Sequence, residues 1–212
     1  MSSCCGSQRN NDTQAIRQAV LDGYTKVAEA GTLTAGTTGC CGSSNTGKGG
    51  MTHEQLASKL GYEVSEIQAL PEGANMGLSC GNPAAIAALQ PGQTVLDLGS
   101  GGGFDCFLAG PKVGDAGRVI GVDMTPAMLS KARHNIAHYQ RSTGLSNVEF
   151  RLGEIEHLPV ADACVDVVIS NCVINLSPNK PQVWREIARV LKPGGVAAVS
   201  DIVMLRPLPD QV

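Results

Sequence analysis

The stretch that determines the fold is GQTVLDLGSGGGFDCFLAGPKVGDAGRVIGVDM, residues 92–124. It contains two short apolar runs, TVLDL (94–98) and RVIGVD (118–123), and the second run ends in an acid. The glycine-rich sequence GSGGG (99–103) follows the first run directly. This order predicts a strand, a glycine loop, a helix and a second strand with an acid at its end. Such a unit is typical of proteins that bind adenosine-containing ligands.

The rest of the chain after residue 124 repeats the alternation of apolar runs and helical spacing. Three more runs rich in β-branched residues are VEFRL (148–152), VDVVIS (165–170) and VAAVSDIV (196–203). Helical patterns over 126–142 and 181–191 separate them. Apolar runs this continuous are typical of parallel strands covered on both faces. We therefore predict that residues 91–212 form an α/β domain, a Rossmann-like three-layer sandwich with a mainly parallel sheet.

The first part of the chain, residues 1–90, has a different character. Its apolar spacing predicts helices over 12–30 and 52–60. Between them lies GTTGCCGSSNTGKGG (36–50), whose glycine and serine content predicts a loop that carries two thiols. We expect residues 1–90 to be a helical and loop-rich appendage to the main domain.

The glycine loop also indicates which ligand is bound. The sixth position counted from Gly99 is Phe104, whereas a dinucleotide fingerprint has glycine there. Asp97 stands at the end of the first strand, where its charge would repel a pyrophosphate and attract an ammonium or sulfonium group. We expect Asp123 to accept the ribose hydroxyls. These residues favour S-adenosylmethionine over NAD, and a tight turn without a ligand is the remaining alternative.

Two loops after later strands extend the predicted cofactor site. Glu154 could accept the adenine amino group and Ile155 could pack on the ring, although Glu154 could equally be a solvated loop acid. Asn171 follows the fourth strand, at the sheet edge where ligands of such folds bind. The predicted cofactor-binding residues are Asp97, Gly99, Ser100, Gly101, Gly103, Asp123, Met124, Gly153, Glu154, Ile155 and Asn171.

Composition disfavours several classes of partner. The net charge is −3 and the pI is about 5.8, and no basic cluster of the kind that binds nucleic acid is present. No apolar run approaches the roughly 20 residues of a membrane span. The N-terminus lacks the apolar core of a signal peptide. We expect a cytoplasmic protein that binds neither nucleic acid nor membranes.

The chain has eight cysteines, which is many for a cytoplasmic protein of this size. In that compartment they indicate free thiols, metal ligands or catalytic groups rather than disulfides. We expect Cys106 to be a small buried residue and Cys164, in a turn, to be incidental. No role for Cys4 and Cys5 follows from the sequence.

Several segments resemble one particular family. VLDLGSGGGFDCFLA, VIGVDMTPAMLSKAR, NVEFRLGEIEHLPV and SNCVINL resemble the arsenite methyltransferases, adenosylmethionine-dependent enzymes that methylate trivalent arsenic. The likeness covers about residues 12–210, and its most specific pieces are GLSCGNP (77–83), GFDCFLA (103–109) and SNCVINLSP (170–178). The resemblance implies S-adenosylmethionine as cofactor, trivalent arsenic as a thiol conjugate for substrate, and a thiol reductant system as partner.

The resemblance also implies which thiolates bind the arsenic. Cys80 and Cys172 match the binding cysteines of the family, and Cys40 or Cys41 stands for its N-terminal cysteine. We expect Cys80, Cys172 and Cys41 to be catalytic, with Cys40 as the alternative to Cys41. Trivalent arsenic is a soft ion, so sulfur ligands suit it. A zinc half-site at Cys40–Cys41 is less favoured because no second pair at C-x₂-C spacing accompanies it.

The C-terminus departs from the family pattern. Methyltransferases of this fold normally have a seven-stranded sheet that ends in an antiparallel pair, whereas five strands are predicted before Val212. We therefore expect residues 91–212 to be a C-terminally truncated domain. Two other functions stay open: a small-molecule C-, N- or O-methyltransferase of the sterol or quinone type, and a metalloid-binding protein without turnover.

Overall fold

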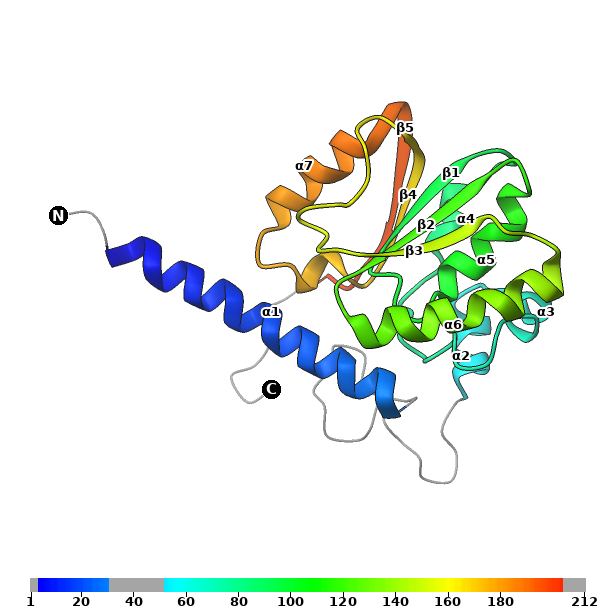
Figure 1. Ribbon diagram of the computed structural model, residues 1–212, viewed down its shortest axis with the longest axis horizontal. Coiled ribbons are helices and arrows are strands. Elements are labelled where there is room, and N and C mark those ends of the chain that lie inside the picture. Colours follow the sequence, from blue (N-terminus) through cyan, green and yellow to red (C-terminus); the bar gives the residue numbers. More distant parts are fainter. Residues whose placement is uncertain (1–3, 31–51, 204–212) are drawn as a thin grey trace.

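A parallel β-sheet forms the centre of the molecule (Figure 1). The computed structural model describes residues 4–30 and 52–203, and this part of the chain forms a five-stranded sheet in the order β3-β2-β1-β4-β5. Every neighbouring pair of strands is parallel. The predicted α/β fold with a mainly parallel sheet is therefore confirmed. The strands are β1 (Thr94–Leu98), β2 (Arg118–Asp123), β3 (Val148–Leu152), β4 (Val165–Asn171) and β5 (Leu191–Ser200).

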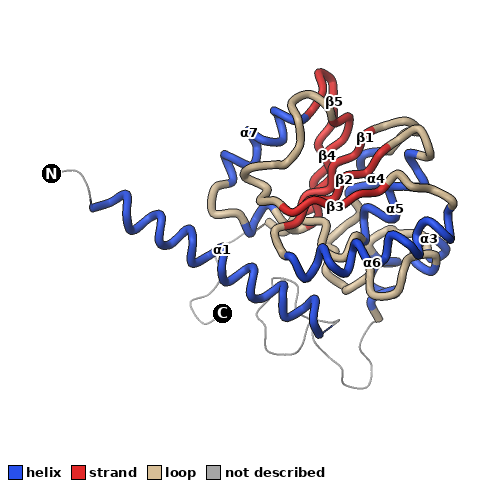
Figure 2. The backbone as a smooth tube through the Cα atoms, viewed as in Figure 1, coloured by secondary structure: helices blue, strands red, loops and turns tan. Residues whose placement is uncertain are grey.

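Helices cover both faces of the sheet and give three layers (Figure 2). Helices α5 and α6 pack on one face, where α4 also contacts β4 and β5, and α7 packs on the other face. The helices are α1 (Cys4–Ala30), α2 (His53–Lys59), α3 (Val64–Gln68), α4 (Pro83–Ala87), α5 (Phe104–Val113), α6 (Pro126–Thr143) and α7 (Lys180–Val190), with a 3₁₀ turn, η1 (Ile174–Leu176), before α7.

The two apolar layers follow from the alternation of side chains along each strand. In β1, Val95 belongs to the core beneath α5 and α6, whereas Leu96 belongs to the core beneath α7. Both side chains are fully buried. Each buried aliphatic side chain of this size contributes roughly 1.5–3 kcal/mol relative to exposure, so the paired layers hold the strands in register.

The N-terminal segments pack directly on the sheet domain. Val27 and Ala28 of α1 form a buried cluster with Met76 and Met128. Tyr62, after α2, makes an edge contact with Phe104 at the start of α5, with ring centroids 4.9 Å apart. These contacts place α1 and the chain around residue 76 near the carboxyl ends of the strands. The division of the chain at residue 90 stays a prediction.

Some element boundaries differ from expectation. Helix α1 begins at Cys4 and not at residue 12. Strand β5 begins at Leu191, so the segment 192–195 belongs to the strand, where Lys192 Nζ lies 2.8 Å from the Asp166 carboxylate of β4. Helix α4 was not predicted, although Asn82 caps it by accepting a hydrogen bond from Ala85 N at 2.9 Å. No helix among the described residues is long and apolar enough to cross a membrane.

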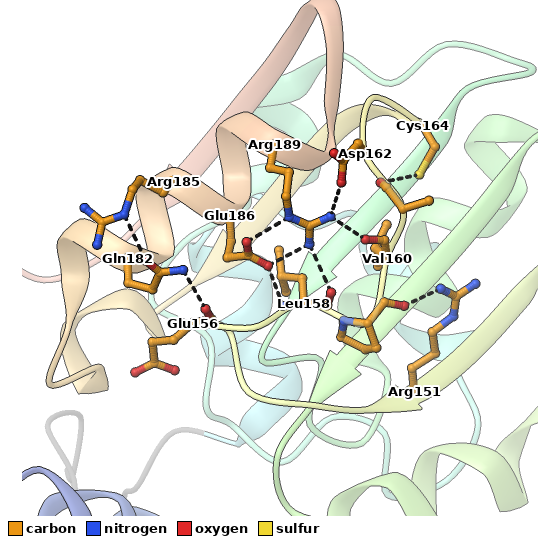
Figure 3. A network of polar contacts seen from close by, with 12 residues as sticks. Arg151, Glu156, Leu158, Val160, Asp162, Cys164, Gln182, Arg185, Glu186 and Arg189 are labelled. Carbon is orange, nitrogen blue, oxygen red and sulfur yellow. Dashed lines mark hydrogen bonds and ion pairs between the residues drawn. The ribbon is translucent and has the colours of Figure 1, made fainter.

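A polar network ties the loop after β3 to α7 (Figure 3). Arg189 of α7 donates to the carbonyl oxygens of Leu158 at 3.1 Å and Val160 at 2.8 Å. It also donates to Glu186 Oε2 at 2.6 Å, and Glu186 in turn accepts a hydrogen bond from Leu158 N at 2.8 Å. The loop that carries Ile155 is therefore anchored by charge-assisted hydrogen bonds rather than by regular secondary structure.

We predict that Arg189→Met lowers the free energy of unfolding by about 2 kcal/mol, because Glu186 and two carbonyls lose a charged donor. The hydrogen bond from Arg189 holds the pKa of Glu186 below its ordinary value. A depressed folded-state pKa stabilises the fold above the unfolded pKa of about 4.3, and this stabilisation disappears as the pH falls through the folded value. The stability gap between wild type and variant should thus shrink below about pH 4.

The measurement is urea unfolding of wild type and variant at pH 7 and at about pH 3, within the range in which the gap should shrink. Arg185→Met is the matched control, because Arg185 is an exposed residue of the same helix that donates to Gln182 Oε1 at 2.8 Å, three residues before it. An equal loss in both variants would contradict a specific role for Arg189.

Candidate active site

A cavity of about 800 Å³ opens at the carboxyl ends of β1, β2 and β4. The strand order β3-β2-β1-β4-β5 changes direction between β1 and β4. Such switch points are the ligand sites of open α/β sheets. Helix α1 forms one wall. The lining residues are Arg17, Val20, Tyr24, Leu78, Gly99, Gly101, Asp123, Met124, Thr125, Met128, Gly153, Ile155, Glu156, Asn171, Cys172, Val173, Leu176, Ser177 and Pro178.

The glycine loop forms the floor of this cavity in a conformation that only glycine tolerates well. Gly99 has φ +68°, and a Cβ atom there would lie 2.5 Å from the Val173 side chain. Gly103 has φ +90° and a Cβ atom there would lie 2.7 Å from Phe107 and Phe150. Both positions therefore need glycine for backbone conformation and for close approach. The amides of Gly99 and Ser100 donate to Val122 O, which fastens the loop to β2.

Asp123 is held ready to accept hydrogen bonds at the end of β2. Its carboxylate oxygens accept from Gly101 N at 2.9 Å and Thr125 N at 2.8 Å, one on each oxygen. Burial raises the pKa of Asp123, while the backbone hydrogen bonds from Thr125 and Gly101 favour its charged form. Asp123 lines the main cavity, so the carboxylate could accept hydroxyls of a ligand bound there.

A smaller cavity of about 420 Å³ adjoins the first and shares Gly99, Gly101 and Asn171 with it. Asp97 lines this cavity and is buried, with the Cys106 thiol donating to its Oδ2 at 3.2 Å. Burial and the charge of Asp105 raise the pKa of Asp97. A cationic group of a ligand would stabilise the ionised form of Asp97.

The small cavity also contains an unused hydrogen-bond donor. Asn75 Nδ2 is buried and has no hydrogen-bond partner in the described part of the chain. Its side-chain oxygen accepts from Gly77 N at 3.1 Å, which fixes the orientation of the amide. A buried donor without a partner costs free energy unless a ligand satisfies it. The small cavity is thus lined by a buried carboxyl group and an unpartnered donor.

The structure separates two acids that the sequence does not distinguish. Glu154 leaves the main cavity and forms an ion pair with Arg17 at 3.3 Å, with 43% of its side chain exposed. Glu156 lines the main cavity and is buried, and it accepts a hydrogen bond from Ser177 Oγ at 2.6 Å. An isolated bridge between Glu154 and His157 turns the loop this way. Sequence reasoning missed Glu156 because no periodic pattern marks the inward side of an irregular turn.

The structure places the other predicted cofactor residues at or next to these cavities. Gly99, Gly101, Asp123, Met124, Gly153, Ile155 and Asn171 line the main cavity, and Asp97 and Ser100 line the small one. Gly103 lies behind the loop, at the start of α5. Arg17 and Tyr24 of α1 also line the main cavity, and neither was predicted.

Cys80 and Cys172 meet at the edge of the main cavity, where they form a disulfide across 92 residues of sequence. Their Cα atoms are 6.1 Å apart, a separation that is ordinary for such a bond. The expectation of free thiols at these two positions was therefore wrong. The cellular compartment predicts only the usual redox state of cysteines. It does not predict that the fold brings these two sulfur atoms into direct contact.

The backbone at Cys172 is unusual. Cys172 has φ +57°, in the left-handed region that residues with a side chain rarely adopt. The amide of Cys172 donates to Ser200 O at 2.8 Å, which holds this conformation against the end of β5. Such strain is common at functional positions, where the surrounding structure enforces it.

The remaining cysteines are dispersed. Cys106 is fully buried and Cys164 donates to Ala161 O at 3.0 Å, as expected for residues without a site role. Cys40 and Cys41 lie outside the described residues. Among the described residues, no group of three or more His, Cys, Asp or Glu side chains could hold a metal ion.

Two relatives that match more than two thirds of this chain are named arsenite methyltransferases. An arsenite methyltransferase of Halobacterium salinarum is 49% identical over 210 residues, which cover 96% of this chain and 51% of the relative. An arsenite methyltransferase of Aquipseudomonas alcaligenes is 45% identical over 68% of this chain and 42% of the relative. The chain spans about half the length of these relatives or less.

Among solved structures, an arsenic(III) S-adenosylmethionine methyltransferase from Chlamydomonas reinhardtii is similar, with a TM-score of 0.59 and 40% identity. The match covers 74% of this chain and 51% of that one. This similarity agrees with the Rossmann-like arrangement of the sheet and helices.

We predict that alkylation of the folded, non-reduced protein leaves Cys80 and Cys172 unlabelled and labels Cys164. Cys106 should resist labelling until the protein unfolds, because burial and then the neighbouring Asp97 raise the pKa of its thiol. Reduction with dithiothreitol should expose Cys80 and Cys172 to the reagent. Peptide mapping by mass spectrometry measures each site, and full labelling of Cys172 before reduction would contradict the disulfide.

The methyltransferase domain family matches residues 89–212, which span the whole sheet from before β1 to the end of the chain. This range holds the glycine loop, Asp123 and Cys172, which together line the main cavity. The chain therefore belongs to the methyltransferase domain family.

Proposed function

We propose that this protein methylates trivalent arsenic with S-adenosylmethionine and binds the arsenic through the thiolates of Cys80 and Cys172. The observation that carries the proposal is the position of Cys172, which lies in the cavity floored by the glycine loop and within bonding distance of Cys80. A methyl acceptor must lie beside the cofactor, and a pair of adjacent sulfurs is a site that suits a soft ion such as arsenic(III). The relatives named arsenite methyltransferases support the same substrate.

The two joined cavities fit S-adenosylmethionine. Asp123 would accept the ribose hydroxyls, and Ile155 and Glu156 would contact the adenine end of the main cavity. Asp97 would face the cationic amino-acid end, and the unpartnered Asn75 Nδ2 would donate to its carboxylate. Glu156 replaces Glu154 in this assignment, because Glu154 points to the neighbouring cavity beside α1.

The protein has little acid–base chemistry to perform in this reaction. When bound, S-adenosylmethionine supplies a methyl group that its sulfonium already activates. Thiolates at Cys80 and Cys172 would hold arsenic through two sulfur bonds and leave its lone pair free as the nucleophile. No general base is then needed. The chain orients the acceptor and excludes water. Holding the acceptor beside the methyl group lowers the activation barrier of the transfer.

A thiol reductant follows from the same arrangement. The disulfide between Cys80 and Cys172 has no thiolate to offer, so it must be reduced by two electrons and two protons before arsenic binds. A dithiol or two equivalents of a monothiol can supply these by exchange, forming their own disulfide. We therefore include a thiol reductant system among the partners, and trivalent arsenic conjugated to a thiol as the form of the substrate.

The direct test is incubation of the protein with arsenite, S-adenosylmethionine and reduced thiol, followed by chromatographic separation of arsenic species. Methylated arsenic is the expected product. Tight arsenite binding without product would favour a metalloid-binding protein, and methylation of quinones or sterols alone would favour the small-molecule alternative. Either of these results would overturn the proposal.

We predict that Cys172→Ser abolishes arsenic methylation, because one of the two sulfur ligands is lost and a hydroxyl binds arsenic(III) poorly. The affinity for S-adenosylmethionine should stay within about twofold of wild type, since the cofactor is held by other residues. Cys164→Ser is the control and should keep full activity, because Cys164 lies in a turn away from the cavity. Full activity of the Cys172 variant would refute the role of this thiol.

We predict that Asp123→Asn weakens S-adenosylmethionine binding by about 10- to 100-fold, because a charged acceptor that faces the cavity is lost. Isothermal calorimetry measures the affinity without depending on turnover. Asp115→Asn is the control, since Asp115 lies in the turn before β2, at the opposite end of that strand. An unchanged affinity in the Asp123 variant would remove Asp123 from the cofactor site.

A further inference from the structure

Three polar side chains from distant parts of the chain meet behind the cysteine pair. Tyr62 follows α2, Asp105 lies in the first turn of α5, and Asn171 is the last residue of β4. Tyr62 Oη lies 2.6 Å from Asp105 Oδ1, and Asn171 Nδ2 lies 3.0 Å from Asp105 Oδ2. Tyr62 is 3% exposed and Asp105 is 6% exposed. Buried groups connected in this way fix one another in place.

The side-chain amide of Asn171 holds the backbone that carries Cys80. Its Oδ1 accepts a hydrogen bond from Cys80 N at 2.9 Å, and its Nδ2 donates to Gly81 O at 2.9 Å. Residues 71–82 form turns and bends and have no strand partner of their own. Asn171 therefore takes the place of a neighbouring strand for this loop, and the next residue in the chain is Cys172.

Asp105 decides which way round this amide lies. Asn171 directs its NH₂ group at Asp105 Oδ2 and leaves its oxygen for Cys80 N, and this orientation suits a carboxylate that accepts. Tyr62 has one hydroxyl hydrogen and two acceptors within reach, Asp105 Oδ1 at 2.6 Å and Gly81 O at 2.8 Å, and the shorter contact favours the carboxylate. The three residues thus form a chain of hydrogen bonds that ends at the backbone of Cys80.

This arrangement leaves the Asn171 amide little capacity for a ligand. Its two N–H groups are directed at Asp105 Oδ2 and Gly81 O, with the Tyr62 hydroxyl oxygen also 3.2 Å away. Both hydrogens are therefore engaged within the protein. The cofactor role predicted for Asn171 from its place after β4 is weaker than a role in holding the loop.

We propose that Asn171, oriented by Asp105 and Tyr62, is a positioning residue that holds the Cys80 loop against the end of β4, so that both sulfurs reach one arsenic atom. This inference rests on the proposed arsenic site for its purpose. When the disulfide is reduced, no covalent bond links the two segments, and these two hydrogen bonds join residues 80 and 81 to β4. A two-sulfur site needs both ligands placed in advance, because ordering a free loop costs conformational entropy.

The test measures how closely the two thiols are held, independently of arsenic. Wild type, Asn171→Ala and Tyr62→Phe are equilibrated at a series of ratios of reduced to oxidised glutathione, and peptide mapping gives the oxidised fraction of the Cys80–Cys172 pair. We expect Asn171→Ala to lower the equilibrium constant for closing this disulfide by about tenfold or more, since two hydrogen bonds to the loop are lost. Tyr62→Phe should lower it by roughly two- to fivefold, because the variant loses one hydroxyl, which lies 2.6 Å from Asp105 Oδ1 and 2.8 Å from Gly81 O of the loop.

Asn179→Ala is the matched control. Asn179 caps α7 by accepting a hydrogen bond from Gln182 N, so its loss lowers stability without touching the Cys80 loop. The glutathione equilibrium of the pair should be unchanged in this variant. A general loss of stability would instead shift all three variants alike, and that result would overturn the positioning role. An unchanged equilibrium in Asn171→Ala would overturn it as well.

Arsenite affinity of the reduced proteins gives the second readout. Asn171→Ala should weaken arsenite binding in proportion to the loss in the glutathione equilibrium, while Tyr62→Phe shows a smaller loss. If Asn171→Ala does not fold, Tyr62→Phe carries the test by itself, because it removes one hydroxyl only. If Asn171→Ala shifts the glutathione equilibrium as expected but the wild type does not methylate arsenite, the proposed function is refuted and the positioning role stays supported. If the wild type methylates arsenite but Asn171→Ala leaves the glutathione equilibrium unchanged, the positioning role is refuted and the proposed function stays supported.

Discussion

The contact between Gly99 and Val173 is the constraint on which the site depends. Gly99 ends β1 in a left-handed conformation, and a Cβ atom at this position would overlap the side chain of Val173. The turn after β1 can therefore lie directly against the chain that leaves β4. This close approach puts the glycine loop, Asp123 and Cys172 around one cavity, at the place where the sheet order reverses.

Three aspartates line the two joined cavities, Asp123 in the main one and Asp97 and Asp105 in the small one, and the protein compensates them unequally. Burial raises the pKa of Asp97, Asp105 and Asp123 alike. Asp123 is offset by backbone amides, and Asp105 by Tyr62 and Asn171. Asp97 has a thiol as its side-chain donor, which is a weak one. A ligand cation would therefore gain most beside Asp97, where we propose that the charged end of S-adenosylmethionine binds.

Local sequence predicted the elements that depend on local rules. The strands of the parallel sheet follow from continuous apolar runs, and α6 follows from helical spacing between Pro126 and Gly144, where the structure places its ends. Prediction failed where a tertiary contact decides the outcome. Strand β5 starts earlier than expected, since Leu191 already pairs with Val165 of β4, and the register shifts before Val196 pairs with Val167. The inward side of the turn at Glu154 and Glu156 depends on a bridge to His157, which no periodicity records.

The sequence by itself determined the sheet class, the glycine loop and the acid at the end of β2, because strand spacing and backbone freedom are properties of neighbouring residues. It also marked Cys80 and Cys172 through their resemblance to a family. Only the tertiary structure decided that these sulfurs meet across 92 residues and that Asn171, Asp105 and Tyr62 hold them from behind. Contacts between distant segments depend on how the layers pack. The linear pattern of residues does not give the distance in space between two residues that lie far apart in the sequence.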